Sequence, residues 1–340
     1  SLKRIKLEDA LIKILSSANH SNKKWITNQY DQMVMCDTAQ KSGSDASIIR
    51  IHNKEKAIAV SVDSSANYCK SHPLTGGKQI VCENWRNLIS VGAQPLAITN
   101  CLNFGNPEKK EIMGEFVQSI KGMKKASEYL NLPIVSGNVS FYNETNNVNI
   151  PPTPQIGAVG VIKDYRKSIA LNTQKAGDQL YLIGNTVGHL SCTAYERIFY
   201  NFSKIKNSTI PPSIDLEEEI KHAKFIHNLI LKGSISACHD ISDGGLIVSV
   251  VEMCLASNTS IKFNNISKKH AFLFGEDQSR YLITVDNSLE KELTYKLKKN
   301  NIAFLKIGSI TSYNSLLNFP DKSFIYRNEL TKLSKEWIKK

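Results

Sequence analysis

The sequence predicts an α/β protein, in the broader sense α+β, that is built from two domains. The length of 340 residues exceeds what one compact core usually holds. Apolar runs typical of strands alternate with stretches of helical spacing, and this alternation restarts after a polar, charged segment at residues 163–175. We therefore expect a first α/β domain over residues 1–165 and a second one, with a C-terminal tail, over residues 166–340.

The first half opens with helical spacing. Leu7, Leu11, Ile14 and Leu15 predict an amphipathic lead-in helix over residues 6–17. Asn106 is a favourable helix cap and Pro107 suits a first helical turn, so the clearest helix should start there and end before Pro133. The other expected elements are strands at residues 47–51, 57–62, 95–99, 133–136 and 156–162, and a helix at residues 78–90.

The second half repeats the alternation without a repeat of short period. The expected strands lie at residues 179–183, 234–239, 280–285 and 306–309. The expected helices lie at residues 193–201, 216–231, 245–256 and 289–299.

Composition indicates a soluble protein of the cytoplasm. Hydrophobic residues make up 41% and charged residues 22%, and the longest apolar run, at residues 246–251, is far shorter than the roughly 20 residues of a membrane span. The charged start of the sequence is followed by no apolar signal region. The seven cysteines form no C-x-x-C pair, which favours reduced, buried thiols over disulfides or a zinc site.

The net charge of +12 raises the question of nucleic acid. The lysines are spread thinly and form no basic stripe interleaved with aromatic residues, so a solvated lysine-rich surface is the simpler interpretation. A phosphorylated substrate would account for part of the charge. We expect neither a nucleic-acid partner nor a membrane partner.

Two polar, glycine-containing segments follow predicted strands. Residues 100–107 (NCLNFGNP) lie between a predicted strand and a predicted helix, and residues 136–142 (SGNVSFY) directly follow another strand. Such junctions suit phosphate, and Asn138 and Ser140 would share one side of an extended segment. Each segment could also be an ordinary turn or cap.

A dispersed set of acidic and amide residues could bind magnesium with phosphates. Asp63 ends a predicted strand, and Glu83 and Asn87 share one helix face at positions i and i+4. Asp240 and Asp243 lie in the turn HDISDGG. Each residue alone is equally explained as a cap or a surface charge.

Other motifs are weaker. Residues 274–279 (FGEDQS) form another glycine–acid turn before a strand, and His239 beside Asp240 is better explained as structural than as an acid–base pair. The sequence contains no phosphate-binding P-loop, dinucleotide fingerprint, nucleophile elbow or H-E-x-x-H motif. The residues alone therefore indicate a cytosolic α/β protein with candidate nucleotide sites, and no reaction.

Longer motifs resemble a known family. Residues 99–113 and 133–162 closely resemble the synthetase subunit of phosphoribosylformylglycinamidine synthase, the PurL family. Residues 28–34, 239–246 and 273–282 match the same family, and the likeness runs from about Lys6 to about Ile310. The resemblance implies two domains like those of aminoimidazole ribonucleotide synthetase (PurM-like).

The resemblance implies a reaction and partners. The family converts formylglycinamide ribonucleotide to its amidine: ATP phosphorylates the amide oxygen and ammonia then displaces phosphate. A glutaminase subunit supplies the ammonia, and a small accessory subunit joins the bacterial complex. This chain resembles only the second of two synthetase modules, so the first half of the same synthetase is an implied partner. The family's catalytic histidine lies in that first half, and we expect the isolated chain to be inactive.

The resemblance also implies site residues. ATP contacts fall at Asn100, Gly137 and Asn138, with magnesium also at Asn138, and a substrate contact falls at Ser140. Asn100 departs from the family's usual aspartate and lacks its charge.

A second, auxiliary nucleotide site is implied as well. In long single-chain relatives it holds ADP with magnesium. Its metal ligands would fall at Asp63, Glu83, Asn87 and Asp240, and Ser242 would contact the nucleotide.

Other functions remain as alternatives. A non-catalytic nucleotide-binding scaffold uses most of the same residues. Aminoimidazole ribonucleotide synthetase itself fits the fold but not the long matches at residues 100–107 and 136–145. Because the surface that normally packs on the first module would be exposed, we expect the isolated chain to form homodimers.

Overall fold

The computed structural model describes residues 5–200, 210–312, 315–321 and 323–326. The chain divides into two compact units. The amino unit comprises residues 37–168 and 203–231, and the carboxyl unit comprises residues 1–36, 169–202 and 232–340. In the part of the chain that the structure describes, no helix combines the length and apolarity that crossing a bilayer requires.

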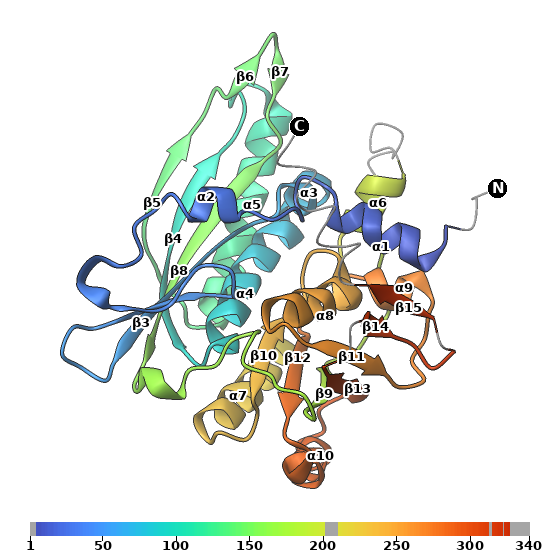
Figure 1. Cartoon of the computed structure of the whole chain (residues 1–340). Coiled ribbons are helices and arrows are strands. Elements are labelled where there is room, and N and C mark those ends of the chain that lie inside the picture. The colour runs from blue at the N-terminus through green and yellow to red at the C-terminus, as the bar shows by residue number, and fades with distance from the viewer. Residues whose placement is uncertain (1–4, 201–209, 313–314, 322, 327–340) are drawn as a thin grey trace. The chain divides into compact units, whose positions relative to one another are not determined.

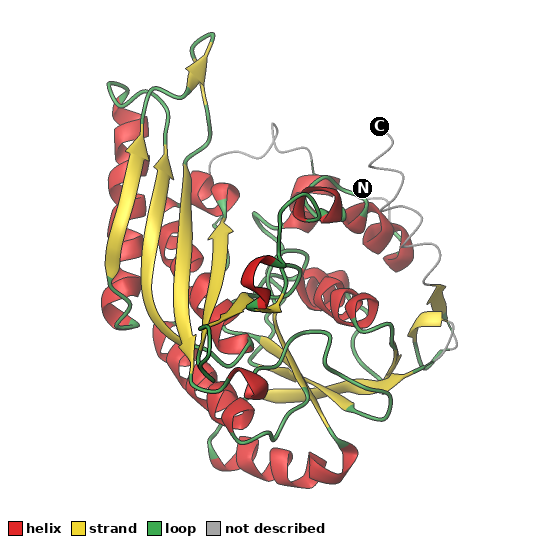
Figure 2. Ribbon diagram, turned by 60° about the vertical axis from the view of Figure 1, so that its left-hand side comes forward, coloured by secondary structure: helices red, strands yellow, loops and turns green. Residues whose placement is uncertain are grey.

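The amino unit contains a six-stranded sheet with helices on one face (Figures 1 and 2). The sheet order is β1-β2-β3-β8-β4-β5. Its strands are β1 (Thr38–Gln40), β2 (Ser47–Arg50), β3 (Ala57–Ser64), β4 (Gln94–Asn103), β5 (Ile134–Ser140) and β8 (Thr153–Ile162). The helices are α3 (Ala66–Ser71), α4 (Pro73–Ser90), α5 (Lys110–Tyr129) and α7 (Leu216–Leu231), and a small hairpin is formed by β6 (Glu144–Thr145) and β7 (Val148–Asn149).

The β4–β5 pair is parallel, whereas the other neighbours in this sheet pair antiparallel. Parallel neighbours need a crossover connection, which α5 provides. In β3 and β8 burial alternates along the strand, so one face of the sheet packs on the helices and the other is exposed.

The two long helices α4 and α5 lie side by side because glycines let their backbones approach closely. A Cβ on Gly77 would lie 2.3 Å from the carbonyl oxygen of Ser119. A Cβ on Gly122 would lie 2.2 Å from the carbonyl oxygen of Leu74. The helix pair therefore depends on glycine at both positions.

Helix α7 belongs to the amino unit although it lies beyond residue 165 in the sequence. Arg86 Nη1 of α4 lies 2.6 Å from Glu219 Oε1 of α7, and both side chains are fully buried. Gln79 Nε2, also buried, donates to the carbonyl oxygen of Pro212 at 2.5 Å. Each of these two contacts joins residues that are 133 positions apart in the sequence. A single domain boundary near residue 165 therefore cannot separate the two compact units.

The carboxyl unit contains a seven-stranded sheet of order β10-β12-β9-β13-β11-β14-β15. Its strands are β9 (Gln179–Ile183), β10 (Ala237–Asp240), β11 (Ser260–Phe263), β12 (Tyr281–Val285), β13 (Phe304–Thr311), β14 (Ser315–Asn318) and β15 (Phe324–Tyr326). Its helices are α1 (Leu7–Leu15), α2 (Lys24–Thr27), α6 (Ala194–Phe199), α8 (Gly245–Ala256), α9 (His270–Phe274) and α10 (Glu290–Lys299).

Helix α1 lies in the carboxyl unit, although the sequence suggested a lead-in to the first domain. Its Leu11 and Ile14 are fully buried in the same core as Leu246 and Val250 of α8. Because α1 is amphipathic, its position is decided by the core that covers its apolar face.

Most elements form where the sequence predicted them, and β9, α7 and α8 have the predicted bounds. The largest errors in predicted strand ends are that β4 extends to Asn103 and β5 to Ser140. The long helix α5 begins at Lys110 and not at Pro107. Asn106 instead accepts a hydrogen bond at Oδ1 from the amide of Glu108 at 3.0 Å, in the turn before the helix.

Candidate functional site

The parallel strands β4 and β5 bring four predicted site residues together in the amino unit. In the strand register Asn100 is paired with Gly137, Cys101 with Asn138 and Asn103 with Ser140. Asn138 and Ser140 lie two positions apart on one strand, so they share one face of it, as predicted. The carboxyl ends of two neighbouring strands thus form one polar edge.

Residues 100–103 and 136–140 are strand residues here, which corrects the prediction that they form loops after strands. Pairing with a neighbour satisfies their backbone groups along the ladder, so the polar sequence does not end the strand. Strand β4 pairs on both sides, with β8 and β5, so the amides of residues 100–103 are engaged in the sheet and do not form a phosphate cradle at the start of α5. Among the described strands, β5 is the edge strand and pairs with β4 on one side alone.

Gly137 has a specific steric role. The Oδ1 atom of Asn100 lies 2.0 Å from the position that a Cβ on residue 137 would take. Only glycine leaves room for the Asn100 side chain in this orientation. An open depression of about 480 Å³ lies at these residues, and its lining includes Asn100, Gly137, Asn138 and Phe116 of α5.

The hydroxyl of Ser140 is held by Asn143. The Nδ2 atom of Asn143 donates to the carbonyl oxygen of Ser140 at 3.0 Å and to that of Phe104 at 2.8 Å. The Ser140 Oγ atom lies 3.3 Å from Asn143 Oδ1 and 3.2 Å from Asn143 Nδ2. Asn143 therefore ties the end of β5 to the segment that follows β4.

The same segment is fixed to the hairpin β6–β7. Asn149 Oδ1 accepts from the amide of Asn106 at 2.7 Å, and Lys109 Nζ lies 2.7 Å from Glu144 Oε2. The Lys109 ammonium and the side-chain amide of Asn106, whose Nδ2 donates to Glu144 Oε1, lower the pKa of the Glu144 carboxyl. This carboxyl group is therefore ionised at neutral pH and holds the hairpin at the edge of the site.

Part of the predicted acidic set also converges in the amino unit. Asp63, near the end of β3, accepts a hydrogen bond at Oδ2 from Asn87 Nδ2 of α4 at 3.3 Å. Glu83 lies one turn earlier on α4, and both α4 residues are half-buried. Asp240 and Ser242 belong to the carboxyl unit.

These side chains have the right donor atoms for magnesium. No three His, Cys, Asp or Glu side chains within the described residues lie close enough to hold a metal ion. The donors of Asp63, Glu83, Asn87 and Asn138 are nevertheless carboxylate and amide oxygens, which magnesium prefers, and magnesium usually takes only one or two protein carboxylates beside phosphates. The residues present therefore fit a nucleotide-bound magnesium better than a metal held by protein alone.

In the carboxyl unit the HDISDGG turn requires its glycines. Gly244 and Gly245 have φ angles of 83° and 70°, in the left-handed region. The amide of Gly244 donates to Glu276 Oε1 at 2.8 Å, and the amide of Ala194, at the start of α6, donates to the same oxygen at 2.8 Å. The fully buried Glu276 carboxylate therefore joins the Ser242 turn to α6.

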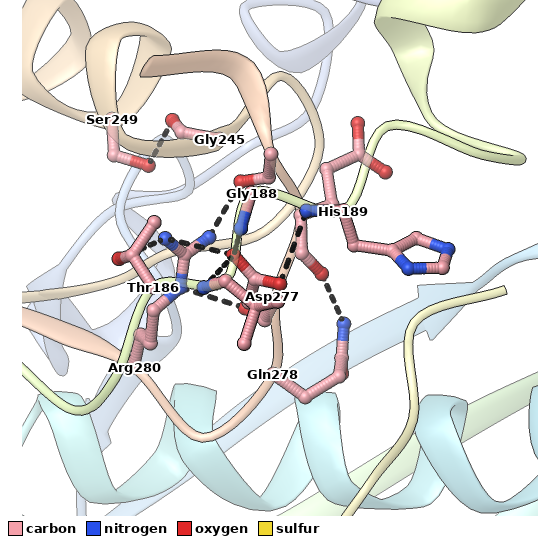
Figure 3. A network of polar contacts seen from close by, with 11 residues as sticks. Thr186, Gly188, His189, Gly245, Ser249, Asp277, Gln278 and Arg280 are labelled. Carbon is pink, nitrogen blue, oxygen red and sulfur yellow. Dashed lines mark hydrogen bonds and ion pairs between the residues drawn. The ribbon is translucent and has the colours of Figure 1, made fainter. Parts of the chain in front are cut away.

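A second network surrounds Asp277 and Arg280 (Figure 3). The Asp277 carboxylate accepts from the amides of Val187, Gly188 and His189 at 3.1, 2.8 and 3.2 Å. The fully buried Arg280 donates to the carbonyl oxygens of Asp277 and Gly275 at 2.8 and 2.6 Å. The sequence predicted only a glycine–acid turn at residues 274–279 (FGEDQS). The amides that donate to Asp277 lie about 90 positions earlier in the chain, so the sequence pattern gave no sign of them.

His239 lies in β10 and is nearly buried. Its Nε2 atom lies 3.2 Å from Glu252 Oε2 of α8. This contact links β10 to α8, so it assigns His239 a structural role.

Two family profiles match the chain. AIR synthase related protein, N-terminal domain, matches residues 43–162, and AIR synthase related protein, C-terminal domain, matches residues 175–316. The chain belongs to the AIR synthase related family. The second profile includes α7, which the fold assigns to the amino unit.

A curated relative carries the name phosphoribosylformylglycinamidine synthase subunit PurL. The protein from Pelagibacter ubique is 45% identical over 339 residues, which are 99% of this chain and 46% of that protein. The chain thus spans about half the length of the curated relatives it matches.

Solved structures share the fold. Thermotoga maritima PurL complexed with FGAR matches 98% of this chain and 54% of its own, with a TM-score of 0.75 and 14% identity. The same protein complexed with ATP matches 85% of this chain and 40% of its own, with a TM-score of 0.58 and 22% identity. The PurM-like α/β fold expected from the sequence is confirmed.

Proposed function

We propose that this chain is the second half of a PurL synthetase, which converts formylglycinamide ribonucleotide to formylglycinamidine ribonucleotide in purine biosynthesis. The observation that carries the proposal is the 45% identity to a PurL subunit over 99% of the chain. The reaction forms a carbon–nitrogen bond at the expense of ATP. ATP transfers its terminal phosphoryl group to the amide oxygen, and ammonia then displaces that phosphate.

In this proposal the β4–β5 edge contributes to an active site shared with the first half. Asn100, Gly137 and Asn138 contact ATP, and Ser140 contacts the ribonucleotide substrate. Support comes from their alignment on two adjacent strands and from the steric dependence of Asn100 on Gly137. Asn100 offers hydrogen bonds but no charge, so it contributes less to a bound cation than the family's usual aspartate would.

Magnesium would be held with the nucleotide phosphates. Asn138 is the proposed protein ligand at the shared site, and the ion would neutralise charge on the phosphates during transfer. At the auxiliary site Asp63, Glu83 and Asn87 of the amino unit would hold magnesium with ADP. The hydrogen bond between Asp63 and Asn87 supports this set.

The exposed face of the amino-unit sheet is the proposed surface for the first half of the synthetase. Apolar side chains alternate along its strands on the face away from α4: Ile49, Ile58, Val62 and Val159 are 41%, 37%, 60% and 38% exposed. An apolar sheet face of this kind is typical of an interaction surface. In the isolated chain the same face would support a homodimer. The glutaminase and small accessory subunits complete the proposed assembly.

The proposal includes a cytoplasmic location. None of the seven cysteines, all of which the structure describes, forms a disulfide, which fits a reducing compartment. Neither nucleic acid nor membrane is a proposed partner.

Two substitutions in the complete enzyme test the shared site. Asn138→Ala and Ser140→Ala should lower turnover at least about a hundredfold if these residues contact ATP and substrate in the transition state. A non-catalytic scaffold, the alternative function, predicts unchanged turnover.

The chain alone should form no amidine from ATP, substrate and ammonia, and measurable product would contradict the shared-site proposal.

A calorimetric titration of the chain with ADP and magnesium tests the auxiliary site. Binding that is lost in Asp63→Asn would assign the site to this set. Binding that is unchanged in Asp63→Asn would place the nucleotide elsewhere.

A further inference from the structure

An open cavity of about 590 Å³ lies in the amino unit, away from the polar β4–β5 edge. It is lined by the end of α4, the start of β4, the end of α5 and one face of α7. Strand β4 connects the two regions: Gln94 lines the cavity, and Asn100 lies six positions further on. At about 3.3 Å per residue the two positions are ~20 Å apart.

The cavity walls are aromatic and aliphatic. Trp85 of α4 is 7% exposed and Tyr129, the last residue of α5, is 50% exposed. Ile89, Leu96 and Ile220 extend the apolar lining. Ligand cavities of this size with mostly apolar walls and a few convergent polar groups bind small molecules.

The polar part of the lining is cationic. Lys224 of α7 is the one charged residue among the described residues that line the cavity. It makes no ion pair with any other described residue, and it is exposed. An unneutralised ammonium at the edge of an aromatic cavity favours an anionic ligand.

His227, one turn further on α7, adds a neutral polar group. Its Nε2 atom lies 3.2 Å from the carbonyl oxygen of Gly92, and because a carbonyl oxygen only accepts, Nε2 carries the hydrogen. Burial lowers the pKa of His227, so the ring is neutral at pH 7. Lys224 is therefore the source of positive charge within the lining, and Lys163, outside the lining, is a further cation near His227.

We propose that this cavity binds a small planar aromatic molecule that carries one anionic group. The ring lies between Trp85 and Tyr129, and the anionic group pairs with Lys224. This site is separate from the nucleotide residues and does not depend on the proposed synthetase function. It uses only residues of the amino unit.

The test is calorimetric titration of the whole chain with two probes of equal shape, naphthalene-1-sulfonate and neutral naphthalene-1-sulfonamide. We expect one binding site and at least about tenfold tighter binding of the anion. Lys224→Glu should abolish this preference, and Tyr129→Ala should weaken both probes about tenfold. Both side chains are exposed, so each variant should keep the unfolding temperature of the parent chain.

Two matched variants locate the binding. Lys121→Glu makes the same charge change on an exposed position of α5 outside the cavity and should leave the preference intact. Ser140→Ala should leave both affinities unchanged. Absence of binding, equal affinity for the two probes, or equal loss in Lys121→Glu and Lys224→Glu would each overturn the proposal.

Discussion

Asn100 and Gly137 face each other across the parallel strands β4 and β5, and the amide oxygen of Asn100 lies 2.0 Å from where a side chain on residue 137 would begin. The Asn100 carbonyl oxygen lies 3.0 Å from the same point. The polar edge of the amino unit therefore depends on one missing Cβ atom. Any residue larger than glycine must displace the Asn100 side chain or part the strands.

Gly137→Ala should destabilise the chain by about 1–3 kcal/mol through overpacking. Denaturant unfolding of the isolated chain measures this change. The double variant Asn100→Ala/Gly137→Ala should recover part of the loss, because the displaced side chain is then absent. A double variant no more stable than Gly137→Ala would show that the backbone contact, and not the Asn100 side chain, sets the requirement for glycine.

Removing one side chain of the buried Arg86–Glu219 ion pair should lower the free energy of unfolding. Arg86→Met removes the cation that pairs with the buried Glu219 carboxylate, and we expect a loss of about 3–5 kcal/mol in the free energy of unfolding. The double variant Arg86→Met/Glu219→Met should be much closer to the parent chain. Equal destabilisation by the single and double variants would mean that packing, and not charge, dominates this contact.

Stability should fall as the pH drops below about 6.5, the ordinary pKa of histidine. Burial lowers the pKa of His227 and of His270, so the folded chain binds fewer protons than the unfolded chain between the lowered values and 6.5. The contribution of the two neutral histidines to the free energy of unfolding is fully present above pH 6.5. It is lost as the pH falls from 6.5 through the lowered pKa values of the folded chain. Thermal unfolding from pH 7.5 to 5.5 measures it, and His227→Asn should show a shallower dependence.

Glu276→Ala should loosen the Ser242 turn and the start of α6 together. It removes the acceptor of two backbone amides, from Ala194 and Gly244, and we expect about 2–4 kcal/mol of destabilisation. Hydrogen exchange should accelerate at both amides. Glu276→Gln keeps one oxygen acceptor and should lose less. Acceleration at only one of the two amides would contradict a shared anchor.

Thiol labelling should separate the cysteines by burial. Cys36 is exposed and Cys101 half-buried, whereas the other five are buried. Burial raises the pKa of Cys69 to about 12 and that of Cys82 well above its usual range. A thiol-specific reagent at pH 8 should therefore modify only Cys36 and Cys101 in the native chain and all seven in denaturant. Rapid native labelling of Cys69 would show that α3 opens locally.

The sequence predicted some of the contacts among the proposed site residues, but it mispredicted the backbone that carries them. Asn138 and Ser140 do share one side of an extended segment, and Asp63 does approach Asn87. The expected loops are strand residues, because pairing with a neighbouring strand outweighs the turn preference of asparagine, serine and glycine. Asn143 and Glu276 were missed, since their roles depend on backbone groups that sequence patterns do not indicate.

The sequence by itself determined the alternation of helices and strands, the bounds of β9, α7 and α8, and the residue types available to the proposed nucleotide site. Apolar periodicity and glycine positions are local, so they can be identified without knowing the fold. Only the tertiary structure decided which unit α1 and α7 join, and which backbone amides Glu276 holds. Those choices depend on contacts between residues far apart in the sequence, such as Arg86 and Glu219 at a separation of 133 positions, and such contacts form only once the chain has folded.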